Sequence, residues 1–297
     1  MSSRLIKLLK FSKIYHCRTI STTSHTCNFY EPRKPAAYRK TDGKEEIKYS
    51  DDPLTELKER LQFVIDEFKL MGQEIKTKLT QDPIWRLPHD EVDIQWQFKG
   101  DPARINDWVV SMDSDFGFGR SYATLEMTPE GHGIFHGNID TRPIQDGVIK
   151  RTGYCNLRSV RRRAAFHRTI PLGWDAYTHI VLRVRGDGRN YMINLHPTNE
   201  FDISWHDLWS YVLHTRGGPY WQYVKIPFSK FFFSSKGRIQ DKQAGVLMYK
   251  LTFISITAVE PAGPFKLEID FVGVERDDRF QEHSAYELYI SPFPFYT

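Results

Sequence analysis

The clearest periodic pattern in the chain predicts one amphipathic helix, from residue 53 to about residue 82. Its apolar residues recur at alternating intervals of three and four positions, the spacing of one helical face: Leu54, Leu57, Leu61, Val64, Phe68, Met71 and Ile75. Asp52 is a suitable N-cap, and Pro53 fits the first helical position. This narrow apolar face could pack on the chain's own sheet or on a partner helix, and the sequence leaves both open.

From about Ile94 onward, short runs of alternating apolar and polar residues are separated by Gly, Pro, Asp and Asn. Such alternation is typical of strands with one buried face. The apolar members of four runs are Ala123, Leu125 and Met127; Ile180, Leu182 and Val184; Tyr191, Ile193 and Leu195; and Leu267, Ile269 and Phe271. Because no amphipathic helices lie between the runs, the pattern predicts an all-β antiparallel sandwich or jelly roll.

Two turns are marked by glycine. Asp187-Gly188 lies between two of the runs and is expected to form the turn of a tight hairpin, because Gly tolerates a positive φ. Gly217-Gly218-Pro219 precedes a strand with Val224 and Ile226 on one face and Tyr223 and Lys225 on the other. The proline that ends this strand places it at the edge of its sheet.

Composition allows one large domain or two small ones. The 297 residues are 40% hydrophobic and 14% aromatic, which is ample for a sizeable core. The formal net charge of +4 comes from the first 20 residues, which hold five basic residues and no acidic one; the remainder has 36 basic and 37 acidic residues, or −1. A nucleic-acid-binding body is therefore not supported. No apolar run approaches the roughly 18 to 20 residues of a membrane-spanning helix.

The first 20 residues are typical of a mitochondrial presequence. No acid precedes Glu31, hydroxyl residues are frequent, and basic and apolar residues separate on a helical wheel. An ordinary disordered basic terminus is the alternative. We expect the mature chain to begin near Ser21. Since Cys17 and Cys27 lie in or just after this segment, Cys155 is the single cysteine of the body, and a disulfide framework there is excluded.

These patterns divide the chain into five parts. We expect a presequence at residues 1–20, a flexible linker at 21–52, the amphipathic helix at 53–82, a β-sandwich domain at 83–280 and a C-terminal tail at 281–297.

The sequence offers few candidates for catalysis. Gly117-Phe118-Gly119 is followed by a strand-like run, so it does not fit a phosphate-binding loop. Cys155 lies within a predicted strand, where nothing lowers its pKa. His132 and His136 share a strand face and His206 lies near two aspartates, but neither group has metal-ligand spacing. We therefore predict no catalytic residue, no metal site and no cofactor.

The marked charge feature is a basic segment that has no acidic residue between Asp146 and Asp175. Its basic residues are Lys150, Arg151, Arg158, Arg161, Arg162, Arg163 and Arg168. They could attract anionic lipid or an acidic protein face, or could simply face water. The aromatic residues Tyr220, Trp221 and Tyr223 could stack on a sugar, which makes a carbohydrate-binding module the alternative function. The candidate partner-binding or membrane-binding residues are Arg158, Arg161, Arg162, Arg163, Arg168, Tyr220 and Trp221.

Several long stretches resemble the family of complex I intermediate-associated protein 30. They are RVRGDGR (183–189), TRGGPYWQ (215–222), KIPFSKFFFSSKGRIQD (225–241) and GPFKLEIDFVGV (263–274), with supporting matches in WVVSMDSD, GRSYATLEM and RTGYCNLRS. The resemblance covers roughly residues 90 to 285. It implies a galactose-binding-like jelly roll, in agreement with the alternation of the strands.

The resemblance also implies a function. Members of the family are non-enzymatic mitochondrial chaperones for the membrane arm of respiratory complex I (NADH:ubiquinone oxidoreductase). In animals they act with an acyl-CoA dehydrogenase family member and a Toll-pathway signalling intermediate. The resemblance therefore implies a location in the mitochondrial matrix, peripherally on the inner membrane, and no catalytic residues.

Overall fold

The computed structural model describes residues 53–80, 89–99, 101–143, 152–198, 207–235 and 237–282. All of them fall within one structural unit, residues 34–297. The predicted presequence (1–20) and linker (21–52) lie outside the described residues, as does the tail beyond residue 282.

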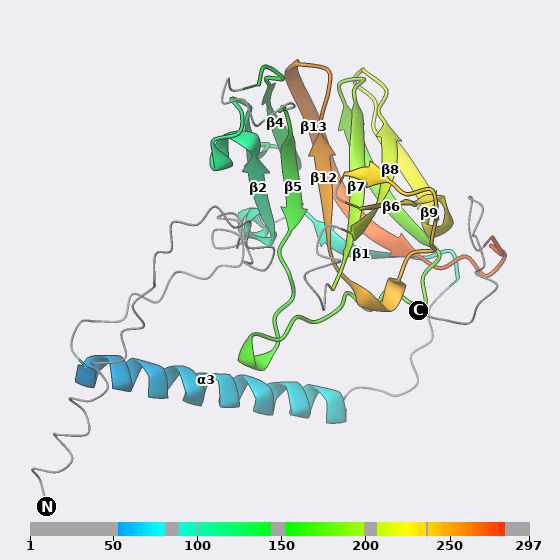
Figure 1. Ribbon diagram of the computed structural model, residues 1–297. Helices are drawn as coiled ribbons and strands as arrows, with labels where there is room; N and C mark the ends of the chain where they lie inside the picture. The colour runs from blue at the N-terminus through cyan, green and yellow to red at the C-terminus, as the bar shows by residue number, and fades with distance from the viewer. Residues whose placement is uncertain are drawn as a thin grey trace, which may run out of the picture. The chain divides into compact units, whose positions relative to one another are not determined.

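Among the described residues, the helix α3 (Pro53–Thr80) precedes the strands and covers most of the predicted range 53–82 (Figure 1). Its apolar residues recur at helical spacing, as the sequence predicted. Within the described residues, the structure contains no helix with the length and apolar character needed to cross a membrane.

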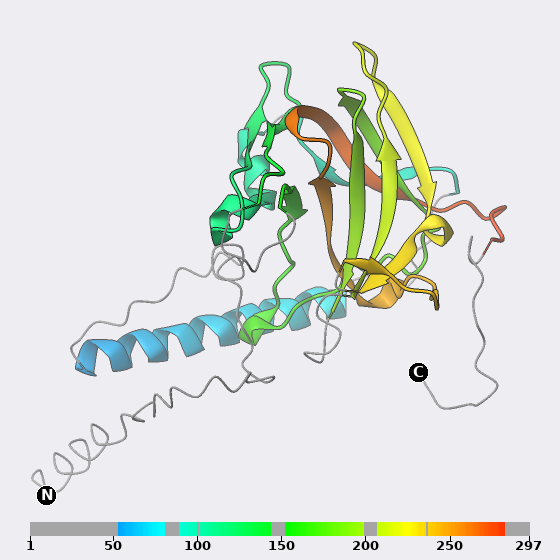
Figure 2. The same cartoon turned by 45° about the horizontal axis from the view of Figure 1, so that its top comes forward.

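The strands form two antiparallel sheets that face each other (Figures 1 and 2). The first sheet has the order β3 (Tyr122–Met127), β4 (Gly133–Ile139), β13 (Gly263–Glu275), β6 (His179–Gly186) and β9 (Gln222–Pro227), and β1 (Val92–Gln97) also pairs with β13. The second has the order β11 (Arg238–Ile239), β10 (Phe232–Ser235), β8 (Asp207–His214), β7 (Asn190–Pro197), β12 (Leu251–Ala258), β5 (Cys155–Ser159) and β2 (Trp108–Met112). This arrangement confirms the predicted jelly-roll β-sandwich with a preceding helix.

Short 3-10 turns connect some of these strands. They are η1 (Pro102–Asp107), η2 (Asp113–Phe116), η3 (Ala165–His167), η4 (Phe228–Lys230) and η5 (Met248–Lys250).

The core lies between the sheets and is filled by alternate residues of their strands. The predicted apolar faces of β6 and β7 are both buried, namely Ile180, Leu182 and Val184 with Tyr191, Ile193 and Leu195. β9 is an edge strand, as predicted, with Val224 and Ile226 toward the core and Tyr223 exposed.

The predicted hairpin at Asp187-Gly188 is wrong. Gly188 does have a positive φ of 94°, but β6 belongs to the first sheet and β7 to the second, so the turn carries the chain between sheets. The Asp187 carboxylate holds this crossing: it accepts hydrogen bonds from the Arg189 and Lys266 amides (3.0 and 2.9 Å) and from the Tyr191 hydroxyl (3.2 Å). Local turn signals identify the turn but not the strand that pairs next.

Phe271 also differs from its predicted place. The register of β13 against β6 shifts between Ile269 and Phe271, and this bulge reverses the alternation. Phe271 therefore leaves the face that holds Leu267 and Ile269, and its ring lies beside exposed Tyr223 (centroids 6.4 Å apart).

Candidate functional site

The apolar face of α3 is largely exposed. Most of its large side chains are 42 to 80% accessible to solvent: Leu57, Leu61, Val64, Ile65, Phe68, Ile75 and Leu79. Exposure of so many apolar side chains on one element is typical of an interaction surface. The narrow apolar pattern in the sequence thus does not serve mainly to pack the helix on the chain's own sheet.

α3 contacts the body through a different set of residues. Glu67 and Glu74, two turns apart, receive the tip of the loop that follows β5. Glu67 is 5% exposed and accepts hydrogen bonds from Arg163 and from the Phe166 amide. Glu74 accepts from the Ala165 amide and from Arg168 (2.7 Å). We call this set of contacts the carboxylate clamp.

The clamp requires an unusual backbone at the loop tip. Phe166 has a φ of 58°, in the left-handed region that non-glycine residues rarely adopt. Its amide is thereby held at Glu67, and its ring meets Phe68 of α3 edge to face, with centroids 5.2 Å apart. Charge-assisted hydrogen bonds to carboxylates offset the cost of such a conformation.

The arginines of the basic segment have diverse surroundings. Arg163 and Arg168 belong to the clamp. Arg162 is exposed and donates to the side-chain oxygen of Gln95 (3.0 Å). Arg158 and Arg161 lie over the ring of Phe253, at 5.3 and 4.6 Å from its centroid. Lys150 and Arg151 lie outside the described residues.

Trp221 contacts the outer face of the first sheet. The guanidinium groups of Arg185 and Arg183 lie 5.0 and 5.3 Å from its ring centroid, and His132 meets its edge at 4.6 Å. Tyr220 is 85% exposed. The structure therefore separates Tyr220 and Trp221 from the arginines of the clamp, which lie on another element.

Around Trp221, cations and carboxylates alternate across the strands. Arg183 pairs with Asp270 (2.7 Å), Arg185 and Lys266 pair with Glu268, and Lys225 pairs with Glu275 (2.6 Å). The three carboxylates are 5 to 6% exposed, whereas the cationic side chains are 27 to 56% exposed. We call this outer surface of β13, β6 and β9 the ionic face.

The protonation of the ionic face follows from its pairing. Burial alone would raise the pKa of the Glu268 carboxyl, but hydrogen bonds from Arg185 and Lys266 outweigh it, so its pKa lies below the ordinary value. Burial would likewise lower the pKa of Lys225, but Glu275 and Asp277 raise it above the ordinary value. Glu268 and Lys225 thus remain ionised at neutral pH.

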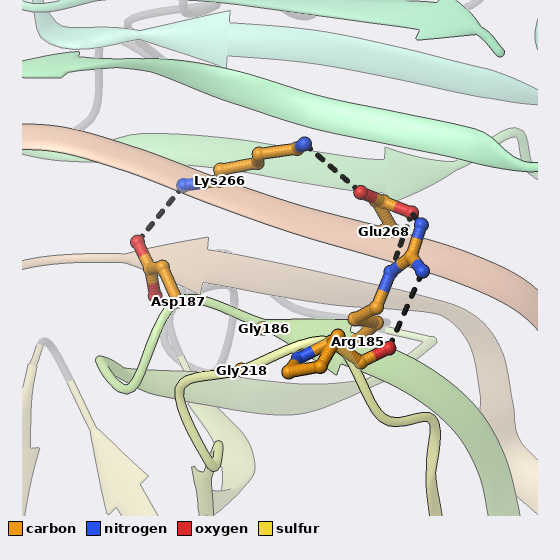
Figure 3. A pocket seen from close by; sticks show the side chains of 7 residues that line it. Arg185, Gly186, Asp187, Gly218, Lys266 and Glu268 are labelled. Carbon is orange, nitrogen blue, oxygen red and sulfur yellow. Dashed lines mark hydrogen bonds and ion pairs between the residues drawn. The ribbon is translucent and has the colours of Figure 1, made fainter.

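A cavity of about 300 Å³ opens at one end of the ionic face. It is lined by Arg185, Gly186, Asp187, Gly218, Pro219, Lys266 and Glu268 (Figure 3). All of these residues fall within three of the stretches that resemble the family, 183–189, 215–222 and 263–274. Segments distant in sequence thus meet at one hollow.

The other candidate residues, Cys155 and the histidines, differ in their surroundings. Cys155 is fully buried, and burial, with Asp113 and Asp115 nearby, raises the pKa of its thiol to about 12, so it stays protonated. His132 lies 3.3 Å from Asp270, and His136 contacts the Thr124 hydroxyl at 3.2 Å. His206 lies outside the described residues. His89, Asp90 and Asp277 form a further group of possible metal ligands, in which His89 and Asp90 are exposed and Asp277 is half-buried.

The Gly117-Phe118-Gly119 turn has a structural explanation too. Gly117 adopts a φ of 68°, and a Cβ at Gly119 would lie 1.9 Å from the buried carboxylate of Asp113. The glycines therefore allow this turn to close over a carboxylate.

Sequence reasoning missed the carboxylates of both sites, although signals were present. Glu67 and Glu74 are seven positions apart and so share a helical side. Glu268 is two positions from Lys266 on β13, and Arg183 and Arg185 have the same spacing on β6, so alternation places each pair on one face. Only the pairing of Glu268 with Arg185 across the sheet, which is non-local, brings these charges together.

Comparison with known sequences shows a family. A sequence model described as complex I intermediate-associated protein 30 matches residues 96–269. Complex I intermediate-associated protein 30, mitochondrial, of Drosophila melanogaster is 43% identical over 92% of this chain and 91% of its own length. The protein of the same name from Mus musculus is 38% identical over 75% of this chain and 69% of its own length.

Solved structures are more distant. The family 11 carbohydrate-binding module of the cellulosomal cellulase Lic26A-Cel5E of Clostridium thermocellum has a TM-score of 0.46 and 11% identity, over 63% of this chain and 96% of that chain. The family 11 module in complex with a mixed-linked tetrasaccharide has a TM-score of 0.43, 13% identity and the same coverage. Identities this low say nothing about a ligand for this chain. The sequence matches, in contrast, span most of the sandwich and its sites, and this chain belongs to the complex I intermediate-associated protein 30 family.

Proposed function

We propose that this chain is a non-enzymatic assembly factor that acts on membrane-arm intermediates of respiratory complex I, in the mitochondrial matrix at the surface of the inner membrane. Family membership and the names of the mitochondrial relatives support the assembly role. The buried, protonated Cys155 thiol fits a protein without covalent catalysis. The proposed protein partners in assembly are an acyl-CoA dehydrogenase family member and a Toll-pathway signalling intermediate.

The observation that carries the membrane part of the proposal is the exposed apolar face of α3. The helix is held by the carboxylate clamp at one edge, so the apolar residues beside it remain available. Burying a single leucine or isoleucine side chain contributes about 1.5 to 3 kcal/mol, and this face offers several.

The charges around that face favour a lipid surface as its occupant. At 100° per residue, Lys58 and Lys76 border the apolar face on one side, and Arg60 and Lys78 border it on the other. Asp66 lies on the opposite side of the helix. Cations that flank an apolar face extend toward lipid phosphates, which is typical of helices that lie in the membrane interface.

The clamp then has a supporting role in membrane contact. Arg163 and Arg168, which the sequence suggested for direct binding, fix the loop to α3. We assign the lipid contact to α3 and an orienting role to these arginines.

Vesicle flotation tests this assignment. We expect Leu61→Glu combined with Ile75→Glu to weaken binding of the full chain to vesicles of phosphatidylcholine and an anionic phospholipid at least tenfold, because two buried apolar contacts are replaced by charges. Gln73→Glu combined with Thr77→Glu adds the same charge on the polar side and serves as the matched control. Equal flotation of both variants would exclude α3 as the lipid-binding element, and capture of complex I subunits by the wild-type helix without lipid would indicate a protein occupant instead.

A further inference from the structure

The cavity at the end of the ionic face has walls that are fixed by internal contacts. Arg185 donates through Nε to Glu268 (2.9 Å) and through Nη1 to the Pro219 carbonyl (3.4 Å), and its guanidinium lies over Trp221. Asp187 accepts from the Lys266 amide, and Lys266 Nζ lies 3.0 Å from Glu268 (Figure 3). A ligand would therefore meet a site that is already ordered, which lowers the entropic cost of binding.

The charges of the cavity are balanced. Its lining holds two cationic side chains, Arg185 and Lys266, and two carboxylates, Asp187 and Glu268. A charged ligand would gain little from such a field, and it would have to displace an existing ion pair in order to be paired itself. Separating a largely buried pair leaves an uncompensated charge, which is strongly unfavourable.

The cavity nevertheless offers many hydrogen-bonding positions. The Lys266 side chain is 56% exposed and its ammonium group has three donors, and each Glu268 oxygen has more than one lone pair. The Pro219 carbonyl is a further acceptor. Donors and acceptors thus alternate over a short distance, and hydroxyl groups, which donate and accept at once, satisfy both without changing any charge.

The size of the cavity and its neighbouring residues further limit the kinds of ligand that it can hold. A volume of about 300 Å³ is at the lower end for small-molecule sites and accommodates a single ring rather than a long chain. Gly218, a lining residue, has no side chain that could narrow the cavity, and Tyr220, which follows the lining residue Pro219, is 85% exposed and carries an aromatic ring.

We propose that this cavity binds a small, uncharged, polyhydroxylated molecule, of which a monosaccharide is the common type. Lys266 and Glu268 bind its hydroxyl groups, Arg185 holds Glu268 in place, and Tyr220 covers an apolar face of the ring. The site lies on the sandwich and is independent of α3 and of membrane contact, so either assignment can fail without the other.

Calorimetric titration of the full chain tests the proposal with glucose, galactose, mannose and myo-inositol as neutral probes and with glucose 6-phosphate as the anionic probe. We expect at least one neutral probe to bind, and Lys266→Met to weaken that binding at least tenfold because two or more hydrogen bonds are lost. Lys242→Met, which removes a lysine from an exposed position away from the cavity, is the matched control and leaves binding unchanged.

Thermal unfolding shows whether each variant is folded, and Tyr220→Ala provides a second variant at a position too exposed to disturb the fold. Loss of binding in Lys266→Met and weakening in Tyr220→Ala, with retention in Lys242→Met, supports the site. Absence of heat with every neutral probe at millimolar concentration overturns the proposal. Preferential binding of glucose 6-phosphate also overturns it. So does binding of a neutral probe that both Lys266→Met and Tyr220→Ala retain.

Discussion

At the scale of single residues, Asp113 joins three separate segments of the sandwich. Its carboxylate is fully buried and accepts hydrogen bonds from the Ser121 amide (3.0 Å), the Ser121 hydroxyl (3.1 Å) and the Gly153 amide (2.8 Å). A buried carboxylate is tolerated when such donors surround it. Gly119 lies directly against it.

Substitution of Gly119 therefore tests how tightly this carboxylate is held. An added Cβ would lie 1.9 Å from Asp113 Oδ2, so Gly119→Ala must displace the carboxylate from its donors. We expect a loss of about 2 kcal/mol or more in the free energy of unfolding, measured by urea denaturation. Gly245→Ala is the control, because its Cβ would meet nothing within 4 Å, and it should change stability by less than about 0.5 kcal/mol. Similar stabilities for the two variants would contradict the close contact.

A second residue, His196, makes the stability of the fold depend on pH. His196 stacks on Phe253 with centroids 4.1 Å apart, and burial, followed by the charges of Arg161 and Arg158, lowers its pKa to about 3. The unfolded chain binds a proton at this residue below its ordinary pKa of 6.5, and the folded chain does not. Its contribution to stability is thus complete above pH 6.5 and is lost as the pH falls toward 3.

The free energy of unfolding is expected to fall by about 1.4 kcal/mol for each pH unit within that window. His196→Gln retains a polar side chain for the Ser255 hydroxyl and removes the titration, so its unfolding free energy should depend less on pH between 6 and 4. Urea denaturation across this range measures the difference. His214→Gln, at an exposed position, should keep the wild-type slope, and a wild-type slope in His196→Gln would show that His196 is not the responsible group.

At the scale of elements, sequence pattern predicts the strands and their buried faces better than their connections. Alternation locates β6, β7 and β9 because burial on one face requires it. Alternation gives no information on which sheet a strand joins, and so it does not distinguish the Asp187-Gly188 crossing from a hairpin. The bulge that moves Phe271 depends on pairing between β13 and β6, which is non-local.

In the candidate sites, too, local features can be predicted from the sequence and non-local contacts cannot. Basic residues and aromatics are visible in the sequence, and the prediction selected Arg163, Arg168 and Trp221 from them. Their partners come from segments far away in the chain: Glu67 lies 96 positions from Arg163, and Glu268 lies 83 positions from Arg185. No local pattern connects such residues, so the clamp and the cavity became apparent only in the folded chain.

The carboxylate clamp makes a prediction about α3. In Glu67→Gln combined with Glu74→Gln, the Ala165 and Phe166 amides lose charged acceptors, and Arg163 and Arg168 lose their partners. We expect hydrogen exchange at residues 164–168 to be at least tenfold faster, since a hydrogen bond to a charged group contributes about 1.5 to 3 kcal/mol. Asp66→Asn, which removes a neighbouring carboxylate that contacts Lys69 and Gln62 within the helix, is the control. Unchanged exchange in the double variant would mean that the clamp does not hold the loop.

At the scale of the whole molecule, the described residues combine a β-sandwich with the helix α3, most of whose apolar face is exposed. The sandwich satisfies its own charges on the ionic face, whereas α3 leaves large apolar side chains exposed. This division agrees with our proposal that α3 binds the membrane surface.

Native electrophoresis of mitochondrial membranes after deletion of the gene is the decisive test of the proposed role in complex I assembly. We predict loss of mature complex I, accumulation of stalled membrane-arm intermediates, and restoration of the mature complex by the full-length chain. A normal amount of mature complex I in the deletion strain would contradict the assembly function.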